Sequence, residues 1–162
     1  MELHELQKCI IDNTIPNALT LYGEEVGIMD IYVEKIKSIL NKDVFQFETV
    51  QEAFVQSMKK RLTNKPRCFI VKNDGAFIKS DKIDLVVKHF NTTSDTLILI
   101  YGSIDKRSKF YKNGNTSLIE FNYLEPNVLV KYVSKLLPNI KNEEALNLIN
   151  ACTCNYSRLI LE

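Results

Sequence analysis

The sequence lacks any apolar run that approaches the ~20 residues needed to cross a bilayer. Its first nine residues, MELHELQKC, contain neither the apolar core of a signal peptide nor an arginine-rich transit helix. Net charge is also nearly absent, because 21 basic and 20 acidic residues leave a formal charge of +1. So small a charge gives no global attraction to nucleic acid or anionic lipid. We therefore expect a soluble, cytoplasmic protein without membrane contact, in which any nucleic-acid contact is local.

Residues that bind metals or act as nucleophiles are scarce. The two histidines are His4, in a polar segment, and His89, and there are four cysteines. Cys152 and Cys154 form a C-x-C pair, but no second cysteine or histidine pair completes a zinc site, and the spacing shows no disulfide framework. The G-x-S-x-G and H-E-x-x-H motifs are missing as well. We therefore expect structural thiols, no metal, no cofactor and no enzymatic activity.

The phosphate-binding motif of nucleotide-binding α/β proteins is also missing. Such proteins place a glycine-rich loop between the first strand and the next helix, where backbone N–H groups hold the phosphates. At that position this sequence has LYGEEVGIMD, residues 21–30, which lacks both G-x-x-x-x-G-K-[ST] and G-x-G-x-x-G. Glu24 and Glu25 place negative charge where a polyphosphate needs positive charge. Nucleotide binding at this loop is therefore disfavoured.

What the sequence does contain is an alternation of strand and helix patterns. Runs of apolar residues bounded by turn residues predict strands at 17–23, 43–49, 66–73, 96–102 and 117–122. Apolar residues at helical spacing predict intervening helices at 27–40, from 50 to about 62 after a Thr49–Glu52 capping box, and at about 80–90. This alternation predicts an α/β fold with a five-stranded, mostly parallel sheet and helices on both faces.

The pattern changes beyond residue 122. The segment EPNVLVKYVSKLL, residues 125–137, places Pro126 at the first position of a helix. The segment NEEALNLINAC, residues 142–152, predicts a second helix with Asn142 as its N-cap and two acidic residues in its first turn. We therefore expect an α/β domain over residues 1–122 and a small helical domain over residues 123–162.

Two basic clusters stand out against the balanced charge, KKR at 59–61 and DKRSKFYK at 105–112. The second cluster interleaves Phe110 and Tyr111, and aromatic residues stack on bases in single-strand binding sites. Its basic residues, which are candidates for contact with DNA or another subunit, are Lys106, Arg107, Lys109 and Lys112. The simpler interpretation is a solvated surface whose charge is balanced by acidic residues elsewhere.

Four segments together resemble the delta subunit of the bacterial DNA polymerase III clamp loader. In chain order they are LTLYGEEVGIMDIYVEKIKSIL, RCFIVKND, DTLILIYGSIDKRSKFYK and SLIEFNYLEPNVLVKYV, and the resemblance spans roughly residues 17–162. It implies an AAA+-like first domain with a degenerate phosphate loop, a helical lid and a collar. It also implies a subunit that does not hydrolyse ATP. Such a subunit binds the ring-shaped sliding clamp and holds one interface open while ATP-binding siblings load the clamp onto DNA.

The same resemblance implies a clamp-binding site. In the family, an apolar wedge near the end of the helix before the central strand contacts the clamp, and the matching positions here are Arg61 and Leu62, with Met58 one turn earlier. An arginine weakens a hydrophobic wedge, although its aliphatic stem also packs. Phe54, Met58 and Leu62 share one helical stripe, so the alternative is that some of them face the sheet.

The leading hypothesis is thus a non-catalytic, delta-like protein that binds the sliding clamp (beta), opening its interface or competing for it. Other clamp-loader subunits are further expected partners, and DNA contact is expected to be indirect. A nucleic-acid-binding module that uses the 106–112 cluster is the alternative, and a small NTP-dependent enzyme is the third hypothesis. The sequence ends within the region that matches the lid, so we expect either part of a longer chain or a naturally short version without the collar.

Overall fold

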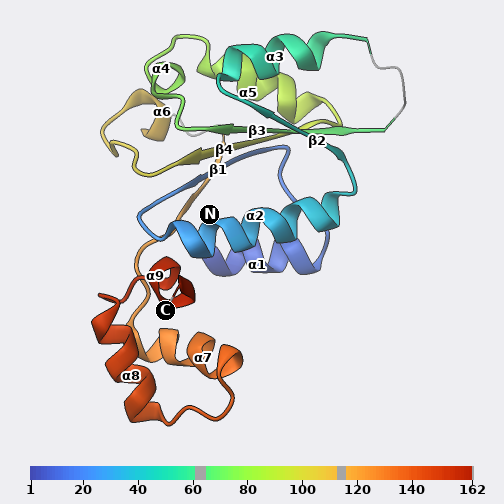
Figure 1. Ribbon diagram of the computed structural model, residues 1–162. Coiled ribbons are helices and arrows are strands. Elements are labelled where there is room, and N and C mark those ends of the chain that lie inside the picture. Colours follow the sequence, from blue (N-terminus) through green and yellow to red (C-terminus); the bar gives the residue numbers. More distant parts are fainter. Residues whose placement is uncertain (61–64, 113–115, 162) are drawn as a thin grey trace.

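The computed structural model describes residues 1–60, 65–112 and 116–161 (Figure 1). Within these residues, five strands form one sheet in the order β2-β3-β4-β1-β5. The strands are β1 (Ala18–Tyr22), β2 (Asp43–Phe47), β3 (Arg67–Lys72), β4 (Thr96–Tyr101) and β5 (Ser117–Glu120). Every neighbouring pair in this sheet is parallel. The predicted α/β class and five-stranded parallel sheet are therefore confirmed.

Helices cover both faces of the sheet, as the sequence predicts (Figure 1). The helices of the α/β part are α1 (Leu3–Ile11), α2 (Val26–Leu40), α3 (Val50–Met58), α4 (Gly75–Ile78), α5 (Ile83–Thr92) and α6 (Lys109–Lys112). Helices α1 and α2 lie on one face, and α3 and α5 lie on the other. None of the described helices is long and apolar enough to span a membrane.

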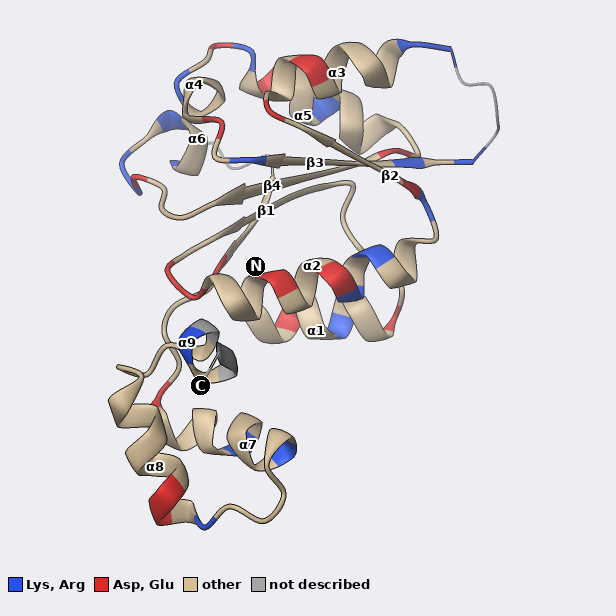
Figure 2. Cartoon of the chain, viewed as in Figure 1, with Lys and Arg blue, Asp and Glu red and all other residues tan. Residues whose placement is uncertain are grey.

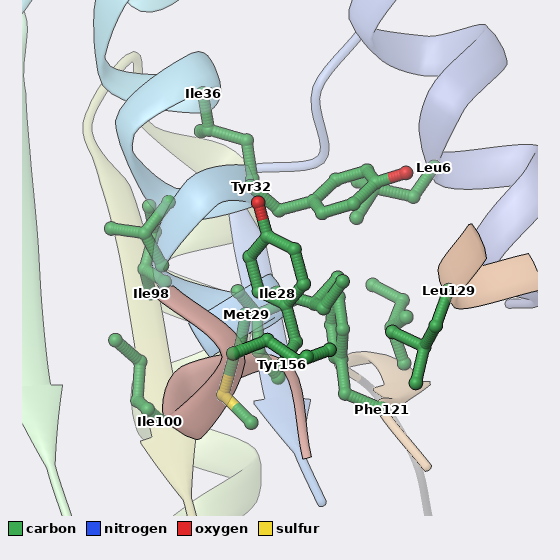
Figure 3. Packing of buried hydrophobic residues seen from close by; sticks show 14 of the residues in the cluster. Leu6, Ile28, Met29, Tyr32, Ile36, Ile98, Ile100, Phe121, Leu129 and Tyr156 are labelled. Atoms are coloured by element: carbon green, nitrogen blue, oxygen red, sulfur yellow. The ribbon is translucent and has the colours of Figure 1, made fainter. Parts of the chain in front are cut away.

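The core consists of two apolar layers, one on each side of the sheet. Successive side chains of a strand point to opposite faces, so Ile98 and Ile100 of β4 pack toward α2, whereas Leu97 and Leu99 pack toward α3 and α5. All residues of β1 and β4 are buried, as expected for central strands of a parallel sheet with both faces covered. Figure 3 shows part of the layer on the α2 side.

Beyond β5 the chain forms a helical unit. Its helices are α7 (Pro126–Leu136), α8 (Asn142–Ala151) and α9 (Tyr156–Leu161). Pro126 is at the start of α7, as predicted, whereas the N-cap of α8 is Lys141, one residue before the predicted Asn142. Helices α7 and α8 pack on each other, and α9 packs on α2. The core of the helical unit is therefore continuous with the α2 side of the sheet.

The four cysteines differ in accessibility, which gives a simple test of the fold. Cys68 and Cys152 are buried, whereas Cys9 and Cys154 are partly exposed. Burial raises the pKa of the Cys68 thiol to about 11, so it stays protonated and unreactive where an exposed thiol ionises. We expect a thiol reagent at about pH 8 to modify Cys9 and Cys154 rapidly, and Cys68 only on unfolding. Peptide mapping after timed labelling measures this, and early labelling of Cys68 would contradict the packing of β3.

Candidate functional site

The loop between β1 and α2, residues 23–25, is the position of a phosphate loop in this type of fold. It lies at the carboxyl edge of the parallel sheet, where α/β proteins bind ligands. Gly23 has φ of +140°, and a Cβ atom placed there would lie 2.1 Å from the carbonyl oxygen of Phe121. The glycine is thus required because the chain that leaves β5 crosses the loop in close contact.

Two backbone donors of this loop, and the first of α2, are hydrogen-bonded within the protein. The N–H of Gly23 donates to the carbonyl of Tyr101 at 3.1 Å, and the N–H of Glu25 donates to the carbonyl of Phe121 at 3.1 Å. The N–H of Val26 donates to the carbonyl of Glu24, also at 3.1 Å. A phosphate loop instead directs such donors toward the ligand. The loop therefore departs from a phosphate loop in geometry as well as in sequence.

The side chain of Glu25 connects this loop to the helical unit. Glu25 is fully buried, and its Oε2 accepts a hydrogen bond of 3.1 Å from the backbone N–H of Tyr156, the first residue of α9. Tyr156 is itself buried, and Figure 3 shows it beside Ile28 and Met29 of α2. Glu25, whose charge disfavours phosphate binding, thus joins the α/β part of the molecule to the helical unit.

Helix α3 carries Met58, the one predicted clamp-binding residue that lies within the described residues. The hydroxyl of Thr49 accepts a hydrogen bond from the N–H of Glu52 at 3.2 Å, as the sequence predicts for the start of this helix. The helix ends at Met58, however, instead of continuing to residue 62. Met58 lies in the last turn with 58% of its surface exposed. The other two predicted positions, Arg61 and Leu62, lie outside the described residues.

The last turn of α3 is bonded to two neighbouring elements. The guanidinium of Arg67, in β3, donates to the carbonyl of Gln56 at 3.0 Å and to that of Ser57 at 2.6 Å. On the α5 side, Nε2 of His89 lies 2.9 Å from the hydroxyl of Ser57. Sequence reasoning did not single out Arg67, because it lies within an otherwise apolar strand pattern.

The first two cations of the predicted basic cluster form ion pairs. Nζ of Lys106 lies 2.9 Å from a carboxylate oxygen of Glu120, and this hydrogen-bonded partner raises the pKa of the lysine. Nε of Arg107 lies 3.2 Å from Asp105, whose pKa is lowered by a hydrogen bond from the Arg107 backbone. Figure 2 shows basic and acidic residues side by side in the segment before α6. The local charge is therefore mixed.

The rest of the cluster lies on α6. Nζ of Lys109 is 4.0 Å from Asp81, and Lys112 is exposed at the end of the helix. Phe110 is buried and contacts two aromatic rings of the core. Tyr111 packs edge-on against Tyr22 at a centroid distance of 6.1 Å. The two aromatic residues proposed to stack on bases thus pack within the protein, which weakens the nucleic-acid hypothesis.

We expect this cluster to bind DNA weakly at most. An interface in which all four cations neutralise phosphates gives a slope of about −3.6 for log K against log salt concentration. Because at least three of the cations already have acidic partners, we expect a slope no steeper than about −1. Fluorescence anisotropy with labelled duplex DNA at several salt concentrations measures the slope. A steep slope that Lys112→Ala and Lys106→Ala both reduce would restore the nucleic-acid hypothesis.

Metal ligands do not gather in the described parts of the chain. Over residues 1–60, 65–112 and 116–161, no group of three or more histidine, cysteine, aspartate or glutamate side chains is placed to hold a metal ion. The features that the structure brings together are the closed loop after β1 and the anchored, partly apolar end of α3.

The sheet order and the helical unit that follows it define an AAA+-like fold. No family model matches the sequence, and no curated protein does either. Two solved variants of RuvB from Thermotoga maritima are similar in structure. One has a TM-score of 0.58 at 13% identity, and the other 0.55 at 11%. Each match covers 96% of this chain and 56% of the RuvB chain.

Within this class, the chain is also similar to the DNA clamp loader delta protein YqeN of Bacillus subtilis. The TM-score is 0.65 at 17% identity, and the match covers 98% of this chain and 55% of YqeN. The resemblance that the four sequence segments predict is therefore confirmed at the level of the fold. The chain spans about half the length of these three solved structures.

Proposed function

We propose that the chain is a non-catalytic, clamp-loader delta-like protein that binds a sliding clamp through the end of α3. The observation that carries the proposal is the likeness to a clamp loader delta protein over 98% of the chain. Other clamp-loader subunits are proposed as further partners, and DNA contact is proposed to be indirect.

The non-catalytic part of the proposal is supported by the loop after β1. Its N–H groups at Gly23 and Glu25 are bonded to other strands and linkers of the protein, and it lacks the lysine of a phosphate loop. The backbone of Phe121 lies against Gly23. A polyphosphate would have to displace these contacts and lie beside two glutamates. This arrangement favours a subunit that acts through protein contact over one that turns over nucleotide.

The clamp-binding part is supported by apolar surface on α3. Met58 is 58% exposed, and Val55, in the preceding turn, is 41% exposed. A methionine suits an irregular hydrophobic pocket, because its side chain is unbranched and adaptable. Burying one such side chain in a partner contributes about 1.5–3 kcal/mol, which corresponds to a factor of about 10–100 in Kd.

We therefore expect Met58→Ala to weaken binding to the clamp about 10-fold or more. The matched control is Ile11→Ala, because Ile11 is 82% exposed but lies on α1, across the sheet from α3. Isothermal titration calorimetry with the sliding clamp of the same organism measures both affinities.

Two outcomes would count against the proposal. If the unsubstituted protein does not bind the clamp at tens of micromolar, clamp binding is wrong. If Met58→Ala and Ile11→Ala weaken binding equally, the clamp contacts some other surface than the end of α3.

A further inference from the structure

A buried ion pair lies beneath the end of α3. Arg67, at the start of β3, and Asp95, just before β4, are 8% and 1% exposed. Nη2 and Nε of Arg67 lie 2.9 Å and 3.2 Å from Oδ2 of Asp95, and Oδ1 accepts the backbone N–H of Arg67 at 2.8 Å. The aspartate thus holds the guanidinium group in one orientation.

The remaining donors of this guanidinium point at α3. They bind the carbonyl oxygens of Gln56 and Ser57, at 3.0 Å and 2.6 Å. Carbonyl groups in the last turn of a helix lack the usual i+4 partners and carry its negative dipole end, although the carbonyl of Gln56 also accepts the N–H of Lys59 at 3.2 Å. Arginine suits this position because its planar group presents several donors in a fixed fork, which the single ammonium of lysine does not reproduce.

A second anchor reaches the same turn from α5. The hydroxyl of Ser57 donates to the carbonyl of Phe54 at 2.7 Å, so it accepts a hydrogen bond from Nε2 of His89 at 2.9 Å. The rings of Phe54 and His89 meet edge to face, with centroids 5.2 Å apart. Helix α3 is therefore fixed from β3 and from α5 immediately before the exposed Met58.

We propose that Arg67 is a positioning residue for partner binding: it fixes the last turn of α3 and thereby the direction in which Met58 projects. This inference rests on the proposed function, because it concerns the same contact surface. A side chain held in its binding geometry loses less conformational freedom on association, so preorganisation increases affinity without adding a contact. Arg67 itself is buried and does not touch the partner.

The test uses Arg67→Lys, which keeps the charge beside Asp95 but removes the fork that binds the two carbonyl groups. The matched control is Ile119→Val, a mild change in the core of β5, away from α3. We expect Arg67→Lys to raise hydrogen exchange in the last turn of α3 about 10-fold or more, with β1 and β4 still protected. We expect the same variant to weaken clamp binding about 5- to 10-fold. Ile119→Val is expected to change neither the hydrogen exchange of α3 nor the clamp affinity.

A double-mutant cycle separates positioning from a merely structural role. If Arg67 acts through Met58, Arg67→Lys has little further effect on clamp affinity in a Met58→Ala background. Additive effects, or unchanged exchange in the last turn of α3, would overturn the inference. If Arg67→Lys does not fold, Asp95→Asn provides the same comparison, because it removes the negative charge and one of the two acceptor oxygens that hold Arg67. Absence of clamp binding by the unsubstituted protein would overturn the proposed function, and the exchange experiment would still decide whether Arg67 holds α3.

Discussion

Replacing Gly23 with alanine is expected to lower the free energy of unfolding by about 3–5 kcal/mol, a large fraction of the ~5–15 kcal/mol that stabilises a typical domain. The residue has φ of +140°, which a residue with a Cβ atom rarely adopts. The new Cβ would also lie within 3 Å of three backbone atoms of Phe121. Those atoms are held in place, because the N–H of Phe121 donates to the carbonyl of Tyr22 at 2.7 Å.

Urea denaturation followed by circular dichroism measures this change. The control is Gly102→Ala, at a glycine with open space around its Cβ position, and we expect it to change the stability by no more than about 1 kcal/mol. If the two variants are equally stable, the close crossing of Phe121 over the loop is wrong.

The fold could be predicted from the sequence because local pattern and burial agree. The strands β1 and β4 are continuous apolar runs, and they are buried on both faces. Helix α2 shows its buried residues at regular spacing, and Ile28, Tyr32 and Ile36 pack on the sheet. Helix α1 was not predicted, because Leu6 is its one buried residue among charged neighbours.

The candidate site could be predicted only in part, because its key contacts join residues that are distant in the sequence. Apolar periodicity alone extends α3 to residue 62, whereas the helix ends at Met58, where Arg67 binds the carbonyl groups of its last turn. Phe110 among lysines resembles a base-stacking residue, but only the packing around α6 reveals that it is buried. The sequence shows which residue types a segment contains, but the tertiary fold determines which of their side chains face the solvent.

The buried carboxylate of Glu25 gives the second large expected effect. Glu25→Ala removes the acceptor for the N–H of Tyr156, and leaving a buried donor without its partner lowers stability by about 1–3 kcal/mol. We expect hydrogen exchange to increase most in α7, α8 and α9, because this bond joins them to the loop after β1. Glu24→Ala is the matched control, since Glu24 is the exposed neighbour in the same loop, and we expect it to behave like the unsubstituted protein.

Nucleotide addition completes this test. With Glu25 turned inward and the N–H groups of Gly23 and Glu25 bonded within the protein, we expect about 1 mM ATP with magnesium to leave the melting temperature unchanged, because a ligand stabilises a fold only by binding it. A rise in melting temperature on adding ATP would contradict the non-catalytic proposal. Equal exchange in the Glu25→Ala and Glu24→Ala variants would contradict the bridge instead. The two results are independent. The melting temperature tests whether the loop binds nucleotide, and hydrogen exchange tests whether Glu25 joins the loop to the helical unit.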